Sequence, residues 1–326
     1  MTKRNFLSLV AAIIFAGVLG VGSLLYISQT NLYESYQPKN VIKPPSYQFS
    51  IDQKDQKVVD KPSAVQAFNG RIYVGGQESV QVFSRNGRKL NEFSLRLKDQ
   101  KLYRPYAHDL TVDEAGSVYV VVGPQNRILV FDQGGDFEKV FPGSRSTRTS
   151  KNPSAYLANP ISVFYEAKNN TLLVSDLAEH AIKRYKTTGR FVKKIGRPGE
   201  KSGQFMYPNG VLATKDGTVY VADSNNARVQ KFKNGRFVSF LEPPKKKSFV
   251  RPKAIAIDKL GRVHVVDSLK GRVLVFAKDG RFLFEYGEKT GAVAGLSLPN
   301  DISIDRETGQ VFIAERGNNR VSVWAN

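Results

Sequence analysis

The amino-acid sequence predicts an all-β protein, a six-bladed β-propeller that follows one N-terminal transmembrane helix. Three observations lead to this prediction. A proline-led group of short alternating strands recurs six times, glycine turns rather than helical periodicity separate the strands, and a long apolar run stands near the N-terminus. Repeats of about 40 to 50 residues with roughly four short strands each are typical of propeller blades.

The first segment, residues 1–28, is predicted to be a transmembrane anchor. Phe6 to Ile27 contain no charge and follow Lys3 and Arg4. At roughly 1.5 Å per residue such a helix is about 33 Å long, enough to cross a hydrocarbon core of about 30 Å. Because basic flanks stay on the cytoplasmic side, we expect a single-pass membrane protein with the remaining chain on the extracytoplasmic side. A cleaved signal peptide is the alternative.

Residues 29–46 contain three prolines and no apolar periodicity, so they are predicted to be a semi-extended tether. The propeller itself is predicted over residues 47–326. Its repeats are 43 to 55 residues apart and begin at Pro62, Pro105, Pro160, Pro208, Pro252 and Pro299.

The clearest repeat is Pro208 to Gly235, PNGVLATKDGTVYVADSNNARVQKFKNG, and related copies begin at Pro252 and Pro299. Each contains a strand, a glycine turn, a strand that ends in an acid, a polar loop and a strand that opens with arginine. This pattern resembles the NHL repeat family, in a membrane-anchored form of bacterial type. The resemblance covers residues 62–326 and implies a six-bladed NHL propeller. Propellers of that family mostly bind protein, RNA or a ligand, and lyases are among their relatives.

The sixth repeat lacks its outer strand, because the chain ends just after the third strand of that repeat. Residues 47–52, YQFSID, alternate like the outer strands of other repeats. We therefore predict that this segment pairs with the last blade, closes the ring and removes an exposed sheet edge.

The charge of the chain predicts an anionic partner. There are 49 lysines and arginines against 29 acids, a net charge of +20, which attracts anionic surfaces and polymers. Export and the lack of an aromatic stacking row in the basic loops make nucleic acid an unfavoured partner. No cofactor is predicted, because no phosphate-binding glycine loop is present, and the lack of cysteine excludes disulfides and thiolate sites.

In a propeller, the linkers between blades and the loops between second and third strands share one face, called here the linker face. Two linkers are long or basic, and the residues that open the inner strands should surround the channel on the same face. Loops on a rigid scaffold commonly carry function, although such cations can also be ordinary solvated charges. The predicted partner-binding residues are Arg145, Arg148, Lys151, Lys245, Lys246, Lys247, Arg251, Asn209, Lys253, Asn300 and Asp301.

The acid that ends the second strand and the arginine that opens the third are predicted to form structural ion pairs. Two repeats break this rule. Val122 stands opposite Arg127, and Ala181 stands opposite Asp176. Arg127 and Asp176 are thus predicted to be unpaired charges, which mark either a specific site or simple decay of the repeat.

The three histidines, His108, His180 and His264, occupy different positions in their repeats. We predict no metal site, since these positions do not converge as zinc ligands must. His264 is expected to be a packing residue between blades. His108 beside Asp109 near the channel is a candidate acid–base pair, or a hydrogen-bonded rim residue.

These observations favour a membrane-tethered extracytoplasmic scaffold that binds a protein or an anionic polymer of the cell envelope. The alternative is an extracytoplasmic lyase or hydrolase with His108 and Asp109 at the channel mouth. Convergent carboxylates and imidazoles there would favour the enzyme, and a shallow basic face would favour binding.

Overall fold

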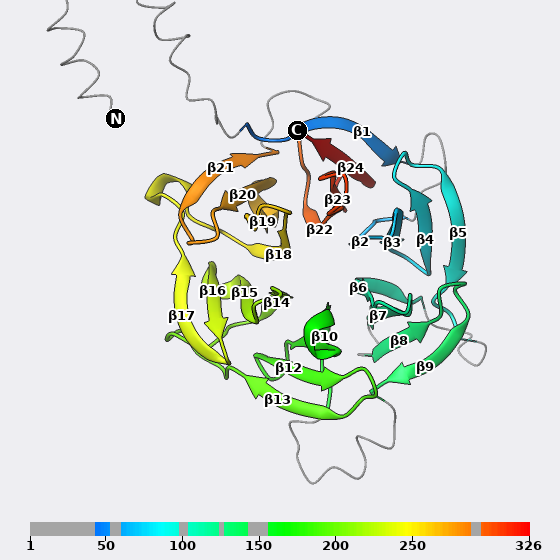
Figure 1. Cartoon of the computed structure of the whole chain (residues 1–326), viewed down its shortest axis with the longest axis horizontal. Helices are drawn as coiled ribbons and strands as arrows, with labels where there is room; N and C mark the ends of the chain where they lie inside the picture. The colour runs from blue at the N-terminus through cyan, green and yellow to red at the C-terminus, as the bar shows by residue number, and fades with distance from the viewer. Residues whose placement is uncertain (1–42, 53–59, 98–103, 124–126, 143–155, 288–294) are drawn as a thin grey trace, which may run out of the picture. The chain divides into compact units, whose positions relative to one another are not determined.

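A computed structural model of the chain describes residues 43–52, 60–97, 104–123, 127–142, 156–287 and 295–326. These residues form six antiparallel four-stranded sheets arranged around an axis, as Figure 1 shows. The predicted all-β six-bladed propeller is confirmed. The predicted anchor and nearly all of the tether lie outside the described residues, and within the described ranges no helix is both long and apolar enough to cross a membrane.

The first three blades are simple meanders, in which each strand pairs with the next one along the chain. Blade 1 contains β2 (Ala64–Phe68), β3 (Arg71–Gly75), β4 (Ser79–Ser84) and β5 (Lys89–Ser94). Blade 2 contains β6 (Tyr106–Val112), β7 (Val118–Gly123), β8 (Arg127–Phe131) and β9 (Phe137–Phe141). Blade 3 contains β10 (Pro160–Glu166), β11 (Thr171–Asp176), β12 (Ala181–Lys186) and β13 (Phe191–Ile195), with the 3-10 turn η2 (Ala167–Asn169).

The next two blades repeat this order and add 3-10 turns to the connections. Blade 4 contains β14 (Pro208–Ala213), β15 (Thr218–Asp223), η3 (Ser224–Asn226), β16 (Arg228–Lys233) and β17 (Arg236–Leu241). The linker turn η4 (Lys245–Lys247) leads to blade 5, which contains β18 (Pro252–Ile257), β19 (Val263–Asp267), η5 (Ser268–Lys270), β20 (Arg272–Phe276) and β21 (Phe282–Tyr286).

Blade 6 is assembled from both ends of the propeller. It contains β22 (Pro299–Ile304), β23 (Val311–Glu315), β24 (Arg320–Ala325) and, as its outer strand, β1 (Ser46–Asp52). The antiparallel register joins Ser46 to Ala325 and Asp52 to Arg320. Figure 1 shows β1 lying along the rim outside β24.

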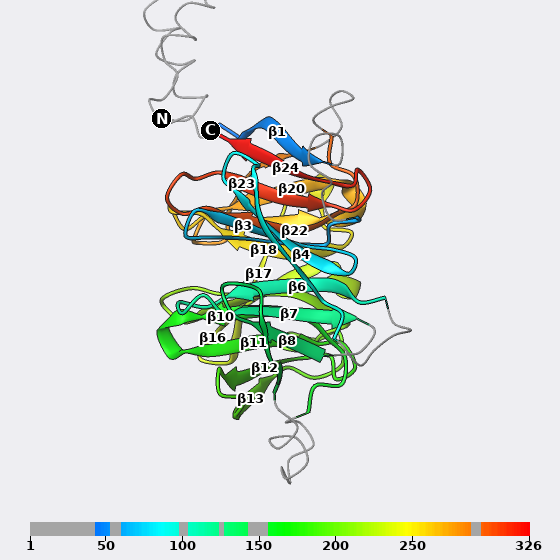
Figure 2. The same ribbon diagram turned by 90° about the vertical axis from the view of Figure 1, so that its right-hand side faces the viewer.

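The hydrophobic core lies between the blades rather than inside any one of them. Six apolar clusters are each shared by two neighbouring sheets. In the first, the rings of Phe93 from blade 1 and Phe131 from blade 2 have centroids 4.8 Å apart. Figure 2 views this ring of sheets from its side. Because both faces of a blade are covered, the middle strands β3, β7, β11, β15, β19 and β23 are almost wholly buried.

Five of the six inner strands share an irregularity at their first residues. The pairing register shifts just after the start of β6, β10, β14, β18 and β22, and it is regular only in β2. Such a bulge re-aims the side chain that it contains. The shift therefore decides which residues of the linker face surround the axis.

Candidate functional site

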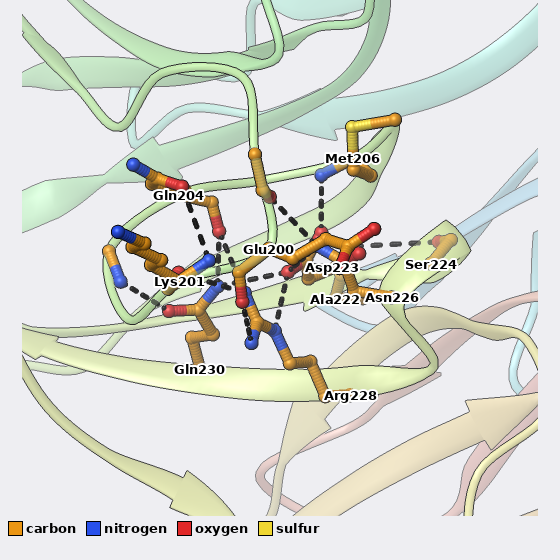
Figure 3. Close-up of polar contacts among 12 residues, drawn as sticks. Glu200, Lys201, Gln204, Met206, Ala222, Asp223, Ser224, Asn226, Arg228 and Gln230 are labelled. Carbon is orange, nitrogen blue, oxygen red and sulfur yellow. Dashed lines mark hydrogen bonds and ion pairs between the residues drawn. The ribbon is translucent and has the colours of Figure 1, made fainter.

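In blades 3 to 6, a buried acid at the end of the second strand holds the linker that leads into the inner strand. Asp223 accepts hydrogen bonds from the Met206 backbone N–H at 2.7 Å, Arg228 Nε at 2.8 Å and Gln230 Nε2 at 2.9 Å (Figure 3). Met206 stands two residues before Pro208, where the inner strand begins. The acid thus fixes the position of that strand relative to the loop.

Blades 5 and 6 use the same arrangement. Asp267 accepts from the Arg251 N–H at 2.8 Å and lies 3.4 Å from Arg272, and Glu315 accepts from the Ser297 N–H at 3.0 Å and pairs with Arg320 at 2.9 Å. The predicted acid–arginine pairs are therefore present, and their role is structural.

The prediction that Asp176 is unpaired is wrong. Its carboxylate lies 2.9 Å from Lys183 Nζ, and both side chains are fully buried. Asp176 also accepts from the backbone N–H groups of Ala158 and Asn159, so a lysine from β12 replaces the arginine of other blades. Arg127 is exposed opposite Val122 and forms no ion pair with any described residue.

One cavity of about 130 Å³ lies at the axis, and side chains from several blades line it. The residue that follows the opening proline is different in nearly every blade, and in blade 2 His108 occupies the corresponding place in the sheet. Five of these positions border the cavity. They are His108, Ile161, Asn209, Lys253 and Asn300. Asp109 and Asp301, one residue further along their strands, also line it. The structure thus brings together six of the predicted site residues, two of which had been assigned to an acid–base pair.

Hydrogen bonds connect the cavity residues of neighbouring blades. Lys253 Nζ donates to Asn300 Oδ1, and Asn300 Nδ2 donates to the Ser63 carbonyl oxygen at 2.8 Å. Asn209 Nδ2 donates to Ser224 Oγ within blade 4 at 2.8 Å, and Ser224 Oγ donates to the Pro252 carbonyl oxygen of blade 5. Blades 5, 6 and 1 are therefore joined by polar contacts at this end of the channel.

Both carboxylates at the cavity accept hydrogen bonds from the next blade. Asp109 accepts from the Val163 N–H at 3.0 Å, and Asp301 accepts from the Val65 N–H at 2.7 Å. Burial deep between the inner strands raises the pKa of Asp109 to about 6. Burial, with the charge of Asp109 nearby, raises the pKa of Asp301 well above its usual range. The protonated forms are thus favoured by the low polarity of the site.

The cationic and imidazole groups are shifted in the opposite direction. Burial, together with Arg251 and Arg316, lowers the pKa of Lys253 to about 8. Burial, together with Lys253 and Arg316, lowers the pKa of His108 to about 4. At neutral pH the imidazole is therefore uncharged, and Lys253 is the cavity group that titrates nearest to neutrality from the basic side.

The predicted acid–base pair of His108 and Asp109 is not formed. Within the described chain no hydrogen bond joins the two side chains. The His108 ring packs edge-on against Tyr106 at 4.6 Å, while Asp109 is bound to backbone N–H groups. The sequence analysis named Lys253 as a binding residue but did not predict that it is a buried lysine with a lowered pKa. Its place directly after an opening proline, where other repeats carry asparagine, was the available signal.

The basic linker before blade 5 differs in part from its prediction. Lys245, Lys246 and Arg251 are exposed, but Lys247 forms an ion pair with Glu285 and lies 5.7 Å from the ring centroid of Phe282. Lys247 is therefore a structural residue rather than a free cation. Arg145, Arg148 and Lys151 lie outside the described residues.

The other two histidines take part in packing contacts. His264 is buried between Tyr286 and Asp258, with Nδ1 3.1 Å from the tyrosine hydroxyl, and His180 Nδ1 accepts from the Tyr207 N–H at 2.9 Å. Among the residues that the structure describes, no three His, Cys, Asp or Glu side chains are grouped so that they could hold a metal ion.

The chain is similar in sequence to proteins with NHL repeats. The family model described as NHL repeat matches residues 205–232, the segment around Asp223. Human NHL repeat-containing protein 3 is 24% identical over 220 residues, which cover 64% of this chain and 48% of that protein. Peptidyl-glycine alpha-amidating monooxygenase A of Xenopus laevis is 25% identical over 133 residues, 37% of this chain and 14% of that protein. The chain thus spans less than half the length of these relatives.

The fold is also similar to that of solved structures. A streptogramin B lyase superposes with a TM-score of 0.61 at 15% identity, over 85% of this chain and 97% of the other. Virginiamycin B lyase from Staphylococcus aureus gives a TM-score of 0.57 at 13% identity, over 87% of this chain and 100% of the other. The chain therefore has the fold of a six-bladed β-propeller, and its segment 205–232 matches the NHL repeat.

Proposed function

We propose that this propeller is an interaction scaffold that binds its partner on the linker face, around the mouth of the axial channel. The observation that carries the proposal is the asymmetry of that mouth. The buried acid that holds the linker occurs in blades 3 to 6, where its role is structural, whereas the residues that open the inner strands differ and line one cavity. Convergence of different polar groups from several blades is typical of a binding site on a repeat scaffold.

The partner we infer is anionic or a protein with an anionic surface, held at the cell envelope by a chain anchored in the membrane. Support comes from the net charge of +20 and the uncharged run from Phe6 to Ile27. Arg251 and Arg316 add to this support, since both are exposed beside Lys253 and neither forms an ion pair with any described residue. Unpaired cations attract an anion without first having to leave a carboxylate partner.

The proposal is tested with poly-L-glutamate as a defined anionic probe, binding to the full chain being measured over a range of salt concentrations. Combined replacement Lys245→Ser, Lys246→Ser and Arg251→Gln should weaken binding and flatten its dependence on salt, because fewer ions are released on binding. Lys247 is left intact, since its pairing with Glu285 supports the linker. Stability should change by no more than about 0.5 kcal/mol, as for other exposed side chains.

The matched control neutralises three exposed arginines in turns at the opposite end of the blades, Arg190, Arg236 and Arg281. It removes the same number of charges from the other face. If this control lost binding while the linker variant kept it, the site would have been assigned to the wrong face.

A second candidate function is a lyase or hydrolase that acts in the axial cavity. The observation in its favour is that two carboxyl groups, an imidazole and a lysine converge in one cavity, the arrangement expected of an enzyme; they are Asp109, Asp301, His108 and Lys253. Lys253 has a pKa of about 8 and Asp109 a pKa of about 6. Such values suit proton transfer near neutral pH. Solved propellers of this fold include virginiamycin B lyase. A solved structure of catalytically inactive virginiamycin B lyase contains quinupristin. Consumption of quinupristin by the chain, lost in Lys253→Met, would support this candidate.

A further inference from the structure

A groove of about 400 Å³ lies on the linker face where blades 5 and 6 meet. It is lined by the turn η5 and by the linker that leads into β22, and Leu269 and Leu298 are among its lining residues. Their relative exposures are 55% and 49%, large for leucines. Two leucines that project from different blades into one groove form an apolar surface that a partner could cover.

The backbone around this groove is firmly held. The Ser268 N–H donates to the Arg251 carbonyl oxygen at 3.1 Å, and the Arg316 N–H donates to the Leu298 carbonyl oxygen at 3.3 Å. Asp267 and Glu315 also hold the same two linkers, because each accepts a hydrogen bond from a backbone N–H of its linker. The leucines are therefore displayed by a preorganised surface, which lowers the entropic cost of binding.

Leu298 has a backbone conformation that does not favour leucine. Its φ is 44°, in the left-handed region, where a residue without a Cβ is the unstrained choice. Lys61 and Tyr207, which stand before the opening prolines of blades 1 and 4, share this conformation, with φ of 52°. Blades 1, 4 and 6 thus share this backbone conformation while carrying three different side chains, so the conformation does not select leucine. A large exposed apolar side chain at this position needs a reason beyond folding.

Two arginines are joined to the two leucine-bearing segments through backbone hydrogen bonds. Arg251 is connected by its carbonyl to η5, and Arg316 lies against Leu298 through the hydrogen bond given above. Both arginines are exposed, and Lys253 reaches from the same linker to Asn300 at the channel. The backbone of the groove is thus hydrogen-bonded to two arginines whose charges also act on Lys253 at the channel mouth.

We propose that the groove between blades 5 and 6 binds an extended acidic peptide segment, with an apolar side chain between Leu269 and Leu298 and a carboxylate at Arg251 and Arg316. The inference rests on the proposed function and narrows its partner. A polymer that carries only anionic groups cannot make apolar contacts with the leucines, and an apolar ligand cannot pair with the arginines. A peptide with alternating acidic and apolar side chains matches both.

The test compares two labelled peptides of equal charge, acetyl-Glu-Leu-Glu-Leu-Glu-amide and acetyl-Glu-Ala-Glu-Ala-Glu-amide. Binding to the full chain in phosphatidylcholine nanodiscs is measured by fluorescence anisotropy. Because burial of one leucine side chain favours binding by a factor of at least about ten, the leucine peptide should bind at least about tenfold more tightly. Leu269→Ser and, separately, Leu298→Gly should remove that difference, and Arg251→Gln with Arg316→Gln should weaken the binding of both peptides.

The control is Leu260→Ser, which removes a leucine of 67% exposure from a turn at the other end of blade 5. It should leave the tenfold preference unchanged, and each variant is checked for a melting temperature no lower than that of the wild type. Equal binding of the two peptides, still sensitive to the arginines, would overturn the peptide proposal and leave the anionic scaffold standing. Equal binding that neither arginine affects would overturn both. Loss of the preference in Leu260→Ser would also overturn the peptide proposal.

Discussion

At the scale of single residues, Asp109 and Asp301 have two properties. They link neighbouring blades through hydrogen bonds, and their burial disfavours the charged carboxylate. Each accepts a backbone N–H from the following blade, which ties the ring together at its inner end. Each is also disfavoured as an anion, since burial raises its pKa. Both side chains line the cavity. Entry of a ligand therefore favours uptake of a proton by these carboxylates, or pairing with a cation, because their charged forms are already disfavoured.

The titration of His108 and of Asp109 should change the stability of the protein with pH in opposite directions. His108 has a folded pKa of about 4, below its usual 6.5, so stability that it contributes is gained as pH rises from 4 to 6.5. Asp109 has a folded pKa of about 6, above its usual 3.8, so stability is lost as pH rises from 3.8 to 6. Over this range the wild type should gain stability relative to His108→Gln and lose it relative to Asp109→Asn, each by about 1 to 3 kcal/mol.

The measurement is the free energy of unfolding in denaturant for the three proteins at pH 4 and pH 6.5. The two differences should change in opposite directions. If both changed in the same direction, or if neither changed with pH, the cavity would be more hydrated than the burial of these groups implies.

Residue pairing could be predicted only where both partners belong to the repeat. Asp223 with Arg228 follows the repeated spacing of five, and so do the pairs in blades 5 and 6. Lys183 comes seven residues after Asp176, on a strand position that faces inward, and Glu285 meets Lys247 from another part of the blade. These pairs depend on which way each strand residue faces and on how the linker crosses the sheet, and the spacing alone does not contain that information.

At the scale of elements, β1 is the strand on which the ring depends. Its six paired residues give blade 6 an outer edge, and Ile51 is buried against blade 1. Tyr47 packs edge-on against Trp324, with ring centroids 5.8 Å apart. β1 thus stabilises the contact between the first and last blades as well as its own sheet.

A chain that begins at Lys54 should be much less stable than one that begins at Pro44, because it loses the β1 ladder and opens the edge of β24. The single substitution Ile51→Ala should by itself cost about 2 to 4 kcal/mol. Thermal and denaturant unfolding measure both. Gln48→Ala, on the exposed side of the same strand, is the control and should change stability little; equal melting temperatures for the two shortened chains would contradict a closing role for β1.

The bulges of the inner strands are the elements that the sequence did not reveal. The prolines locate the start of each inner strand, but nothing in the repeat says that the pairing register shifts there in blades 2 to 6 and not in blade 1. A shift of one residue exchanges the two faces of a strand. The sequence could therefore predict which strand positions lie near the channel, but not which side chains point into the cavity. Its hydrogen bonds and shifted pKa values required coordinates.

At the scale of the whole molecule, the repeat period and strand count were enough to predict six blades. Charge by itself could not choose a functional face, because basic residues occur on both, and the prediction of the linker face came from its long and basic linkers. The choice made here depends on how side chains from different blades converge, a property of the closed ring that no single repeat contains.

The membrane topology remains a prediction of the sequence. The full chain should pellet with membranes, and protease added outside intact cells or spheroplasts should cleave it, because the basic residues Lys3 and Arg4 precede the apolar run. A chain without residues 1–28 is the control and should stay in the supernatant. Protection from external protease in intact spheroplasts would place the propeller on the cytoplasmic side.

The pairing of β1 with β24 also sets the order of events during synthesis. Ser46 and Ala325, which share a hydrogen bond, are 279 residues apart. A ribosome therefore releases the rim strand of blade 6 before any other strand of the ring and its partner after all of them, so β1 must wait unpaired while five blades form. Closure of the ring requires β24, and a chain interrupted before that strand leaves β1 without its partner, an open edge by which proteases and chaperones can recognise unfinished copies.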